Sequence, residues 1–248
     1  METIATSPVE HREDSFSPVY AMLRRPSLID YPGHLCRVLF ISGCNLRCFF
    51  CHNTDLTRPR DSYMDWKRLL EALDSSREYW VDSVCISGGE PTLHPKLTDL
   101  IKHIRKHGFR VKLDTNGTKP EVIEAVLPLL DYIAMDYKAP LARYAEISGC
   151  RSFDPDTISR SVELIKNSGC DYEFRTTVVE SWHTEDDMRS ICAELAGAKR
   201  YTLQAYVPPK DLPAEELSLT GRRTPMKVLK RYYEICLPYF PETVLRGA

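Results

Sequence analysis

The feature that most constrains the fold of this chain is a regular alternation of short apolar segments with amphipathic ones. The apolar residues within 97–104, for example, are spaced by three and four, so they share one face of a helix. Strands that are separated by helices pair in parallel, through right-handed crossovers. We expect six strand–helix pairs, with strands at residues 35–41, 83–87, 109–113, 131–136, 172–178 and 200–205 and helices at residues 64–79, 95–107, 121–130, 155–168, 184–196 and 224–237.

Polar residues and glycines lie at the carboxyl end of each expected strand. They are residues 44–51, 88–90, 114–116 and 136–138, with Arg175 and Gln204 on the last two strands. In a parallel sheet the carboxyl ends of the strands form the edge at which ligands bind. Because all six strands contribute, a sheet that curves around one site fits better than a flat sheet with a single crevice. We therefore expect an α/β fold, a partial (β/α)6 TIM-like barrel with parallel strands.

The chain reads as one domain at residues 19–248. Residues 1–18 form a polar lead-in without periodicity, which we expect to be flexible. Residues 209–248 are expected to add the C-terminal helix and a short strand at residues 243–245 that pack on the barrel.

The composition argues against several classes of partner. With 33 basic and 35 acidic residues the net charge is -2, so no basic field favours nucleic acid. No apolar run approaches the roughly 18 residues of a membrane span, and the polar N-terminal segment is unlike a signal peptide. Nine cysteines in such a chain favour a reducing cytoplasm, where clustered thiols bind metals more often than they form disulfides. We therefore expect a cytoplasmic protein with no nucleic-acid or membrane partner.

Three cysteines with C-x3-C-x2-C spacing, Cys44, Cys48 and Cys51, follow the first expected strand. Thiolates this close in sequence can converge on one metal centre, but three of them leave a four-coordinate site incomplete. A structural zinc site would need a fourth ligand from the nearby residues His34, Cys36 or His52, and it usually has two ligand pairs. A 4Fe–4S cluster with one open iron fits the ligand count better. The alternative from a different class is a zinc-stabilised interaction module without catalysis.

A second motif, Ser87-Gly88-Gly89-Glu90-Pro91, follows the second expected strand. Alone it is an ordinary turn, but together with the cysteines it resembles the radical S-adenosylmethionine (SAM) superfamily. Within that superfamily, Leu-Asp-Thr-Asn-Gly at residues 113–117 and Met-Asp-Tyr-Lys at residues 135–138 resemble the glycyl-radical-enzyme activases. The segments at residues 27–33 and 245–247 are similar to the branch that serves anaerobic ribonucleoside-triphosphate reductase, so the resemblance covers nearly the whole chain.

The resemblance implies a cofactor role for each matching residue. Cys44, Cys48 and Cys51 would hold one 4Fe–4S cluster, whose open iron binds the amino and carboxylate groups of SAM. The implied SAM contacts are Phe50 and His52 beside the adenine, Gly88, Gly89 and Glu90 at the methionyl amine, Lys138 at the carboxylate, and Arg175 on the fifth strand. Related pyruvate formate-lyase activases carry a histidine near position 207, where this chain has none, and Gln204 is the expected substitute.

The resemblance also implies a monovalent-cation site, formed by Asp114, Thr115 and Asp136 with the SAM carboxylate. Taken alone, the two aspartates could equally cap helices or bind loop amides. Lys138 alone could be a solvated surface lysine.

The implied activity is reductive cleavage of SAM to methionine and a 5′-deoxyadenosyl radical, which takes a hydrogen atom from a glycine of a partner enzyme. The expected partner is a glycyl radical enzyme, above all anaerobic ribonucleotide reductase, with flavodoxin or ferredoxin as electron donor. An activase of a pyruvate formate-lyase-like partner, or another small radical SAM enzyme, is the alternative. Some activases carry ligands for extra clusters after the third cysteine. Here Cys85 is the only cysteine between residues 53 and 87, so we expect a single cluster.

Overall fold

The computed structural model of the protein describes residues 17–60, 63–149, 154–209 and 221–247. These residues form one sheet whose strands are ordered as in the chain, β1 to β8. Neighbouring strands pair in parallel except β1, which is antiparallel to β2. The strands are β1 (Ala21–Met22), β2 (Cys36–Ile41), β3 (Ser83–Gly88), β4 (Arg110–Thr115), β5 (Tyr132–Asp136), β6 (Asp171–Val178), β7 (Arg200–Ala205) and β8 (Glu242–Arg246).

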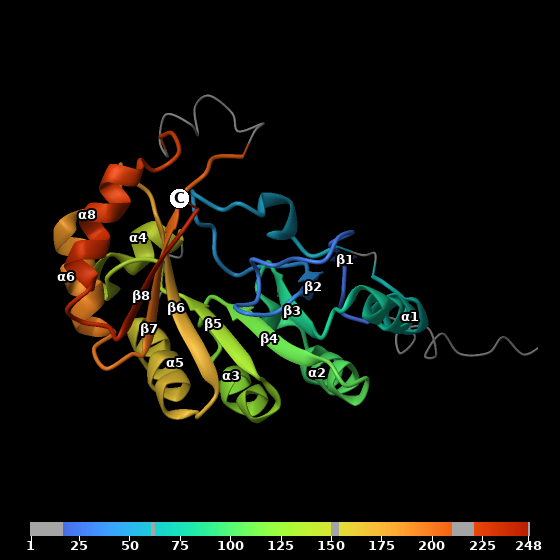
Figure 1. Cartoon of the computed structure of the whole chain (residues 1–248). Helices are drawn as coiled ribbons and strands as arrows, with labels where there is room; N and C mark the ends of the chain where they lie inside the picture. Colours follow the sequence, from blue (N-terminus) through green and yellow to red (C-terminus); the bar gives the residue numbers. More distant parts are fainter. Residues whose placement is uncertain (1–16, 61–62, 150–153, 210–220, 248) are drawn as a thin grey trace, which may run out of the picture.

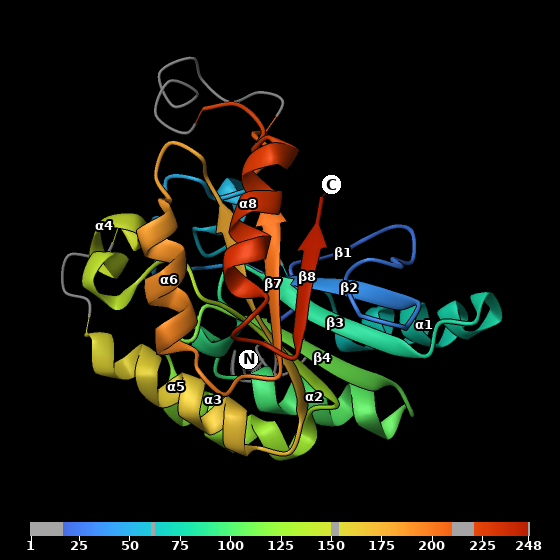
Figure 2. The ribbon, with the colours of Figure 1, turned by 60° about the vertical axis from the view of Figure 1, so that its left-hand side comes forward.

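Helices connect the strands and cover the outer face of the curved sheet, as Figures 1 and 2 show. The α-helices are α1 (Trp66–Ser76), α2 (Leu97–Lys106), α3 (Pro120–Val126), α4 (Tyr144–Ser148), α5 (Pro155–Asn167), α6 (Glu185–Glu194) and α8 (Met226–Cys236). Short 3-10 turns are η3 (Thr54–Leu56), η4 (Arg77–Tyr79), η5 (Pro91–Leu93), η6 (Leu127–Leu129) and η7 (Leu141–Arg143). No helix within the described ranges is long and apolar enough to cross a bilayer.

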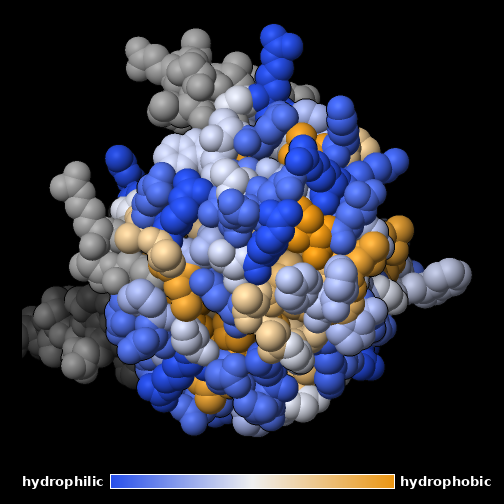
Figure 3. Space-filling view, turned by 90° about the vertical axis from the view of Figure 1, so that its left-hand side faces the viewer, coloured by the Kyte–Doolittle hydropathy of each residue, from blue (hydrophilic) through white to orange (hydrophobic). Residues whose placement is uncertain are grey.

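The two faces of the sheet differ because successive side chains of a strand point to opposite sides. In β4, Val111 and Leu113 belong to the large apolar cluster that joins the sheet to the helices, whereas Lys112 and Asp114 point into the barrel. The outward faces of the helices are mainly polar, with small apolar patches, as Figure 3 shows for the side that carries α6 and α8. The helices therefore bury one apolar stripe against the sheet, as their periodicity predicts.

The interior of the barrel contains buried charge as well as apolar groups. Glu173 of β6 is fully buried, and both of its carboxylate oxygens pair with Arg246 of β8 at 2.9 Å. Thr202 of the intervening strand β7 donates a third hydrogen bond to the same carboxylate at 2.7 Å. This pair links the final strand to the interior of the barrel.

The expected fold class is confirmed, and the six expected strands are β2 to β7. The short strand expected at residues 243–245 is present as β8, and β1 and the five-residue helix α4 were not anticipated. Helix α1 ends earlier than expected, because η4 follows it and Trp80 then adopts a left-handed conformation with φ of 60°. The lead-in expected at residues 1–18 lies almost entirely outside the described residues, and the division into domains stays a prediction.

Candidate functional site

The loop with the three cysteines leaves the carboxyl end of β2 and is closed by backbone hydrogen bonds. The amides of Gly43 and Cys44 donate to the carbonyls of Leu56 and Thr57 at 2.8 and 3.0 Å. The amide of Arg47, halfway along the loop, donates to the carbonyl of Ser148 at 2.9 Å. The unanticipated helix α4, which ends at Ser148, therefore fixes the middle of the cysteine loop.

The three thiols are half-buried on this loop. Cys44 Sγ accepts the amide of Leu46 at 3.4 Å, and Cys48 Sγ donates to the carbonyl of Ser148 at 3.9 Å. Burial raises the pKa of Cys44 and raises that of Cys48 to about 11, while Lys138 acts in the opposite direction. Both thiols are thus protonated at neutral pH, and a bound metal would displace these protons.

The thiols are near enough for charge on Cys44 or Cys51 to raise the pKa of Cys48. Even so, no three Cys, His, Asp or Glu side chains of the described ranges are already arranged as metal ligands. Three soft sulfur donors on one loop suit an iron–sulfur cluster. The metal role of these residues stays a prediction that their placement on one loop fits.

Gly88 and Gly89 let the end of β3 pack directly against the start of the cysteine loop. A Cβ atom at Gly88 would lie 2.2 Å from the carbonyl oxygen of Ile41, and one at Gly89 would lie 2.2 Å from that of Gly43. The amides of Gly89 and Glu90 donate to these same two carbonyls at 2.9 and 2.8 Å. The glycines therefore hold the cysteine loop in place, whatever contact they also make with a cofactor.

Glu90 is 1% exposed, and its carboxylate joins the ends of β3 and β4. It accepts hydrogen bonds from the Thr115 hydroxyl at 2.8 Å, from the backbone amide of Asn116, and from the backbone amide and hydroxyl of Thr92. Burial raises the pKa of Glu90, although these hydrogen bonds oppose the shift. In this structure the carboxylate braces the site, and its predicted contact with the methionyl amine is untested.

Five charged side chains inside the barrel form a group that we call the charged cluster: Lys112, Asp114, Asp136, Lys138 and Arg175. Arg175 lies between the two aspartates, 3.2 Å from Asp114 and 2.9 Å from Asp136. Lys112 pairs with the other oxygen of Asp114, and Lys138 lies 3.3 Å from the other oxygen of Asp136. The cluster thus brings together predicted site residues from the carboxyl ends of β4, β5 and β6.

The cations of the charged cluster keep its carboxylates ionised despite their burial. Burial alone would raise the pKa of Asp136, but Arg175 and Lys138 lower it to about 2. Burial also tends to raise the pKa of Asp114, but Arg175 and Lys112 outweigh it, so that this pKa is lowered as well. Both aspartates are therefore anions at neutral pH.

The remaining predicted SAM contacts, Phe50, His52 and Gln204, differ in burial and in their neighbours. Phe50 is buried, and Lys138 Nζ lies 6.0 Å from the centre of its ring. His52 is exposed, and Gln204 is half-buried on β7 beside Arg246 in the register of the sheet. Phe50 thus lies next to the charged cluster, while the roles of His52 and Gln204 stay predictions.

Sequence reasoning did not find Lys112, which is fully buried. Residues two apart in a strand point to the same face, so a strand that included both Lys112 and Asp114 would have revealed it. The strand expected at residues 109–113 ends before Asp114, whereas β4 continues through Asp114 and brings Lys112 beside it. Asn116 was expected at this edge among residues 114–116 but was given no role of its own, and its side-chain Nδ2 donates to Cys44 Sγ at 3.9 Å.

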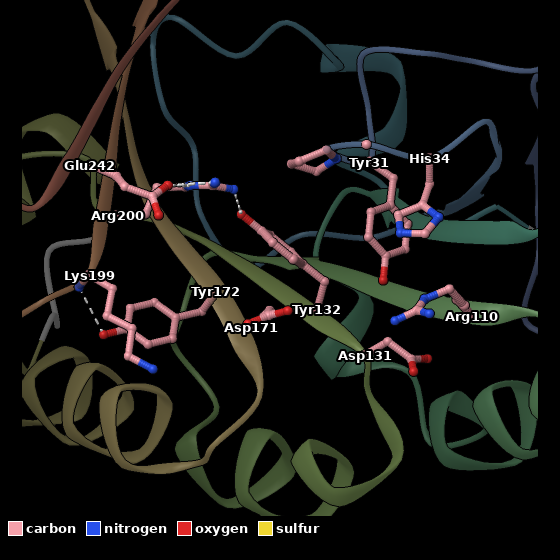
Figure 4. Close-up of a pocket in the computed structure, with 12 residues that line it drawn as sticks. Tyr31, His34, Arg110, Asp131, Tyr132, Asp171, Tyr172, Lys199, Arg200 and Glu242 are labelled. Atoms are coloured by element: carbon pink, nitrogen blue, oxygen red, sulfur yellow. Dashed lines mark hydrogen bonds and ion pairs between the residues drawn. The ribbon is translucent and has the colours of Figure 1, made fainter.

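A cavity of about 380 Å³ lies at the opposite end of the barrel, where the strands begin. Figure 4 shows that Tyr31, Arg110, Tyr132, Arg200 and Glu242 point toward it from separate elements. It is remote from the cysteine loop in the sheet, because Arg110 and Arg200 are the first residues of their strands. The end that holds the cysteines is therefore the candidate site.

Comparison with known proteins agrees with this geometry. A family model described as the radical SAM superfamily matches residues 38–194. A protein of Methanocaldococcus jannaschii, provisionally named a glycyl-radical enzyme activating enzyme, is 32% identical over 229 residues, which are 89% of this chain and 92% of that protein. The pyruvate formate-lyase-activating enzyme of Clostridium pasteurianum is 34% identical over 116 residues, 45% of this chain and 48% of that enzyme.

Solved structures agree on the fold. The crystal structure of Streptococcus suis SuiB bound to precursor peptide SuiA aligns with a TM-score of 0.65 at 16% identity. The alignment covers 84% of this chain and 48% of that one, so this chain spans about half the length of SuiB.

Proposed function

Because this chain belongs to the radical SAM superfamily, we propose that it is an activating enzyme for a glycyl radical enzyme. The observation that carries the proposal is the 32% identity that extends over 89% of this chain to the relative named for this activity. The proposed reaction is reductive cleavage of SAM, followed by removal of a hydrogen atom from a glycine of the partner.

Cys44, Cys48 and Cys51 are the proposed ligands of one 4Fe–4S cluster. Their support is their position on one loop, held by Leu56, by α4 and by the end of β3. When bound, the cluster and SAM supply the electron transfer that breaks a carbon–sulfur bond and forms the 5′-deoxyadenosyl radical. The protein must deprotonate the thiols, orient SAM and exclude water.

The charged cluster is the proposed site for the carboxylate of SAM, since Lys138 is a cation near Cys48 and Phe50, and Arg175 pairs with the same Asp136 as Lys138. Phe50 lies next to Lys138 and is the proposed contact for the adenine, together with the exposed His52. Glu90 and Asn116 hold the ends of β3 and β4 together and so fix the wall against which SAM would lie.

The proposed partner is anaerobic ribonucleotide reductase, with a flavodoxin or ferredoxin as electron donor in the cytoplasm. The support is the similarity of residues 27–33 and 245–247 to the branch that serves this reductase. An activase for a pyruvate formate-lyase-like partner is the alternative, supported by a relative that matches 45% of this chain.

The test is anaerobic reconstitution with iron and sulfide, followed by reduction in the presence of SAM. We expect about four irons per chain, release of 5′-deoxyadenosine, and a glycyl radical signal by electron paramagnetic resonance when the reductase is added. Cys48→Ala should abolish all three, whereas Cys170→Ala, which changes a cysteine outside the loop, should not. A colourless protein that binds one zinc and releases no 5′-deoxyadenosine would contradict the proposal. A glycyl radical in pyruvate formate-lyase alone would instead change the partner.

A further inference from the structure

The four carboxylate oxygens of the charged cluster are all paired with cationic side chains. In Asp114, one oxygen pairs with Lys112 and the other lies 3.2 Å from Arg175. In Asp136, one oxygen lies 2.9 Å from Arg175 and the other 3.3 Å from Lys138. Alkali cations bind through oxygen ligands. Each of these carboxylate oxygens is already paired with a positively charged side chain, which would repel an alkali cation.

The hydroxyl of Thr115, the third side chain of the cation site implied by the resemblance, has other partners. It donates to Glu90 at 2.8 Å and accepts the amide of Gly117 at 3.1 Å. The cause is that β4 continues through Thr115, so that Asp114 and Thr115 point to opposite faces of the strand. The hydroxyl and the two carboxylates therefore do not converge on one point.

The charge of the cluster also disfavours an added cation. Lys112, Lys138 and Arg175 face two carboxylates, so the cluster has one positive charge in excess. The side chains are largely buried, and like charges in such surroundings repel strongly. An anion would balance the excess, whereas an alkali cation would double it.

We propose that Arg175 and Lys112 take the place of the alkali cation, so that this chain binds the carboxylate of SAM without one. This inference rests on the proposed function, since it assumes that SAM is the ligand. Arg175 provides the bridge between Asp114 and Asp136 that a metal ion would otherwise provide. Its fork of N–H donors suits two carboxylates at once.

The test is a series of chloride salts of equal ionic strength, with potassium, sodium or choline as the cation. Equilibrium dialysis of the reconstituted protein measures the dissociation constant of SAM, which we expect to agree within about twofold among the salts. A dissociation constant about tenfold weaker in choline than in potassium or sodium would overturn the proposal.

The midpoint of thermal unfolding of the same protein without SAM is a second measurement. A specifically bound ion stabilises the folded state by mass action. We expect equal midpoints in the three salts, and a rise confined to potassium or sodium would overturn the proposal. If SAM binds in none of the salts, the proposed function is wrong, and the midpoints still decide the question of the cation.

Lys112→Met tests whether the lysine side chain takes the place of an alkali cation. The change frees an oxygen of Asp114, so SAM binding should become about tenfold tighter in potassium or sodium than in choline. Lys102→Met, at an exposed position of α2, is the matched control and should leave SAM binding independent of the salt. A Lys112→Met protein that folds and binds SAM like the original chain in every salt would overturn the role of Lys112. If this variant does not fold, the salt series on the original chain remains decisive.

Discussion

Charged side chains gather at both ends of this barrel, and the two ends use them in different ways. At the carboxyl end, Arg175 is buried and bridges two carboxylates. At the amino end, Arg200 and Glu242 pair at 2.6 Å beside an open cavity, with 29% and 55% of their side chains exposed. An exposed ion pair contributes about 0–1 kcal/mol, whereas a buried charge that loses its partner costs about 3–5 kcal/mol. The geometry of the pairs is similar, so burial decides which end is sensitive to change.

Replacing the central arginine at each end should give the largest difference. Arg175→Met leaves the largely buried Asp114 and the partly exposed Asp136 without their bridge, and we expect the free energy of unfolding to fall by about 3 kcal/mol. Arg200→Met removes a partly exposed pair, and we expect a loss of about 1 kcal/mol or less. Urea unfolding of both variants measures the two values, and equal losses would contradict the distinction between the ends.

Replacing a glycine by alanine should give a smaller difference in stability between the two ends of the barrel. Gly89→Ala places a carbon 2.2 Å from the Gly43 carbonyl, so the cysteine loop must shift. We expect a loss of about 1–3 kcal/mol, the usual cost of overpacking, and less iron bound per chain after reconstitution. Gly169→Ala, just before the amino end of β6, meets no atom within 4 Å and has only the strain of a φ of 72°. Its iron content should be unchanged, and a loss of iron in both variants would break the comparison.

The smallest expected difference is in the dependence of stability on pH. The pKa of Asp136 is lowered to about 2, so its contribution is present above the ordinary carboxyl pKa near 4 and is lost as the pH falls toward 2. The pKa of Asp82, near the amino end, is also lowered, with burial opposing the hydrogen bond from His34. Asp136→Asn should therefore flatten the fall of unfolding free energy between about pH 4 and pH 2 more than Asp82→Asn does. Unfolding by urea at a series of pH values measures both slopes, and a steeper effect at Asp82 would reverse the interpretation.

The sequence was sufficient for the fold because the alternation of strands and helices leaves few topologies. The expected strand at residues 200–205 matches β7 in full, and within it apolar side chains at residues 201, 203 and 205 alternate with polar ones, as in a strand. Arg175 and Asp136 were also placed at one edge correctly, because parallel strands bring their carboxyl ends together.

The charged cluster was harder to predict, because it depends on where one strand ends. The strand expected at residues 109–113 continues to Thr115 in β4. With the shorter strand, Asp114 and Thr115 would lie in a loop and could share a ligand. With the longer strand, their side chains point apart, and Lys112 is brought beside Asp114. Strand ends are set by tertiary contacts, here the bond between Glu90 and Asn116, which no local pattern reveals.

The pairing of Glu173 with Arg246 has a consequence for the order in which the protein forms during synthesis. The two residues are 73 positions apart, so a ribosome that adds about 5–20 residues per second would deliver the arginine roughly 4–15 s after the carboxylate. Until then Glu173 lacks the cation that pairs with both of its carboxylate oxygens, and its burial would be costly. We therefore expect the nascent barrel to stay incomplete on its inner side until residue 246 has left the exit tunnel.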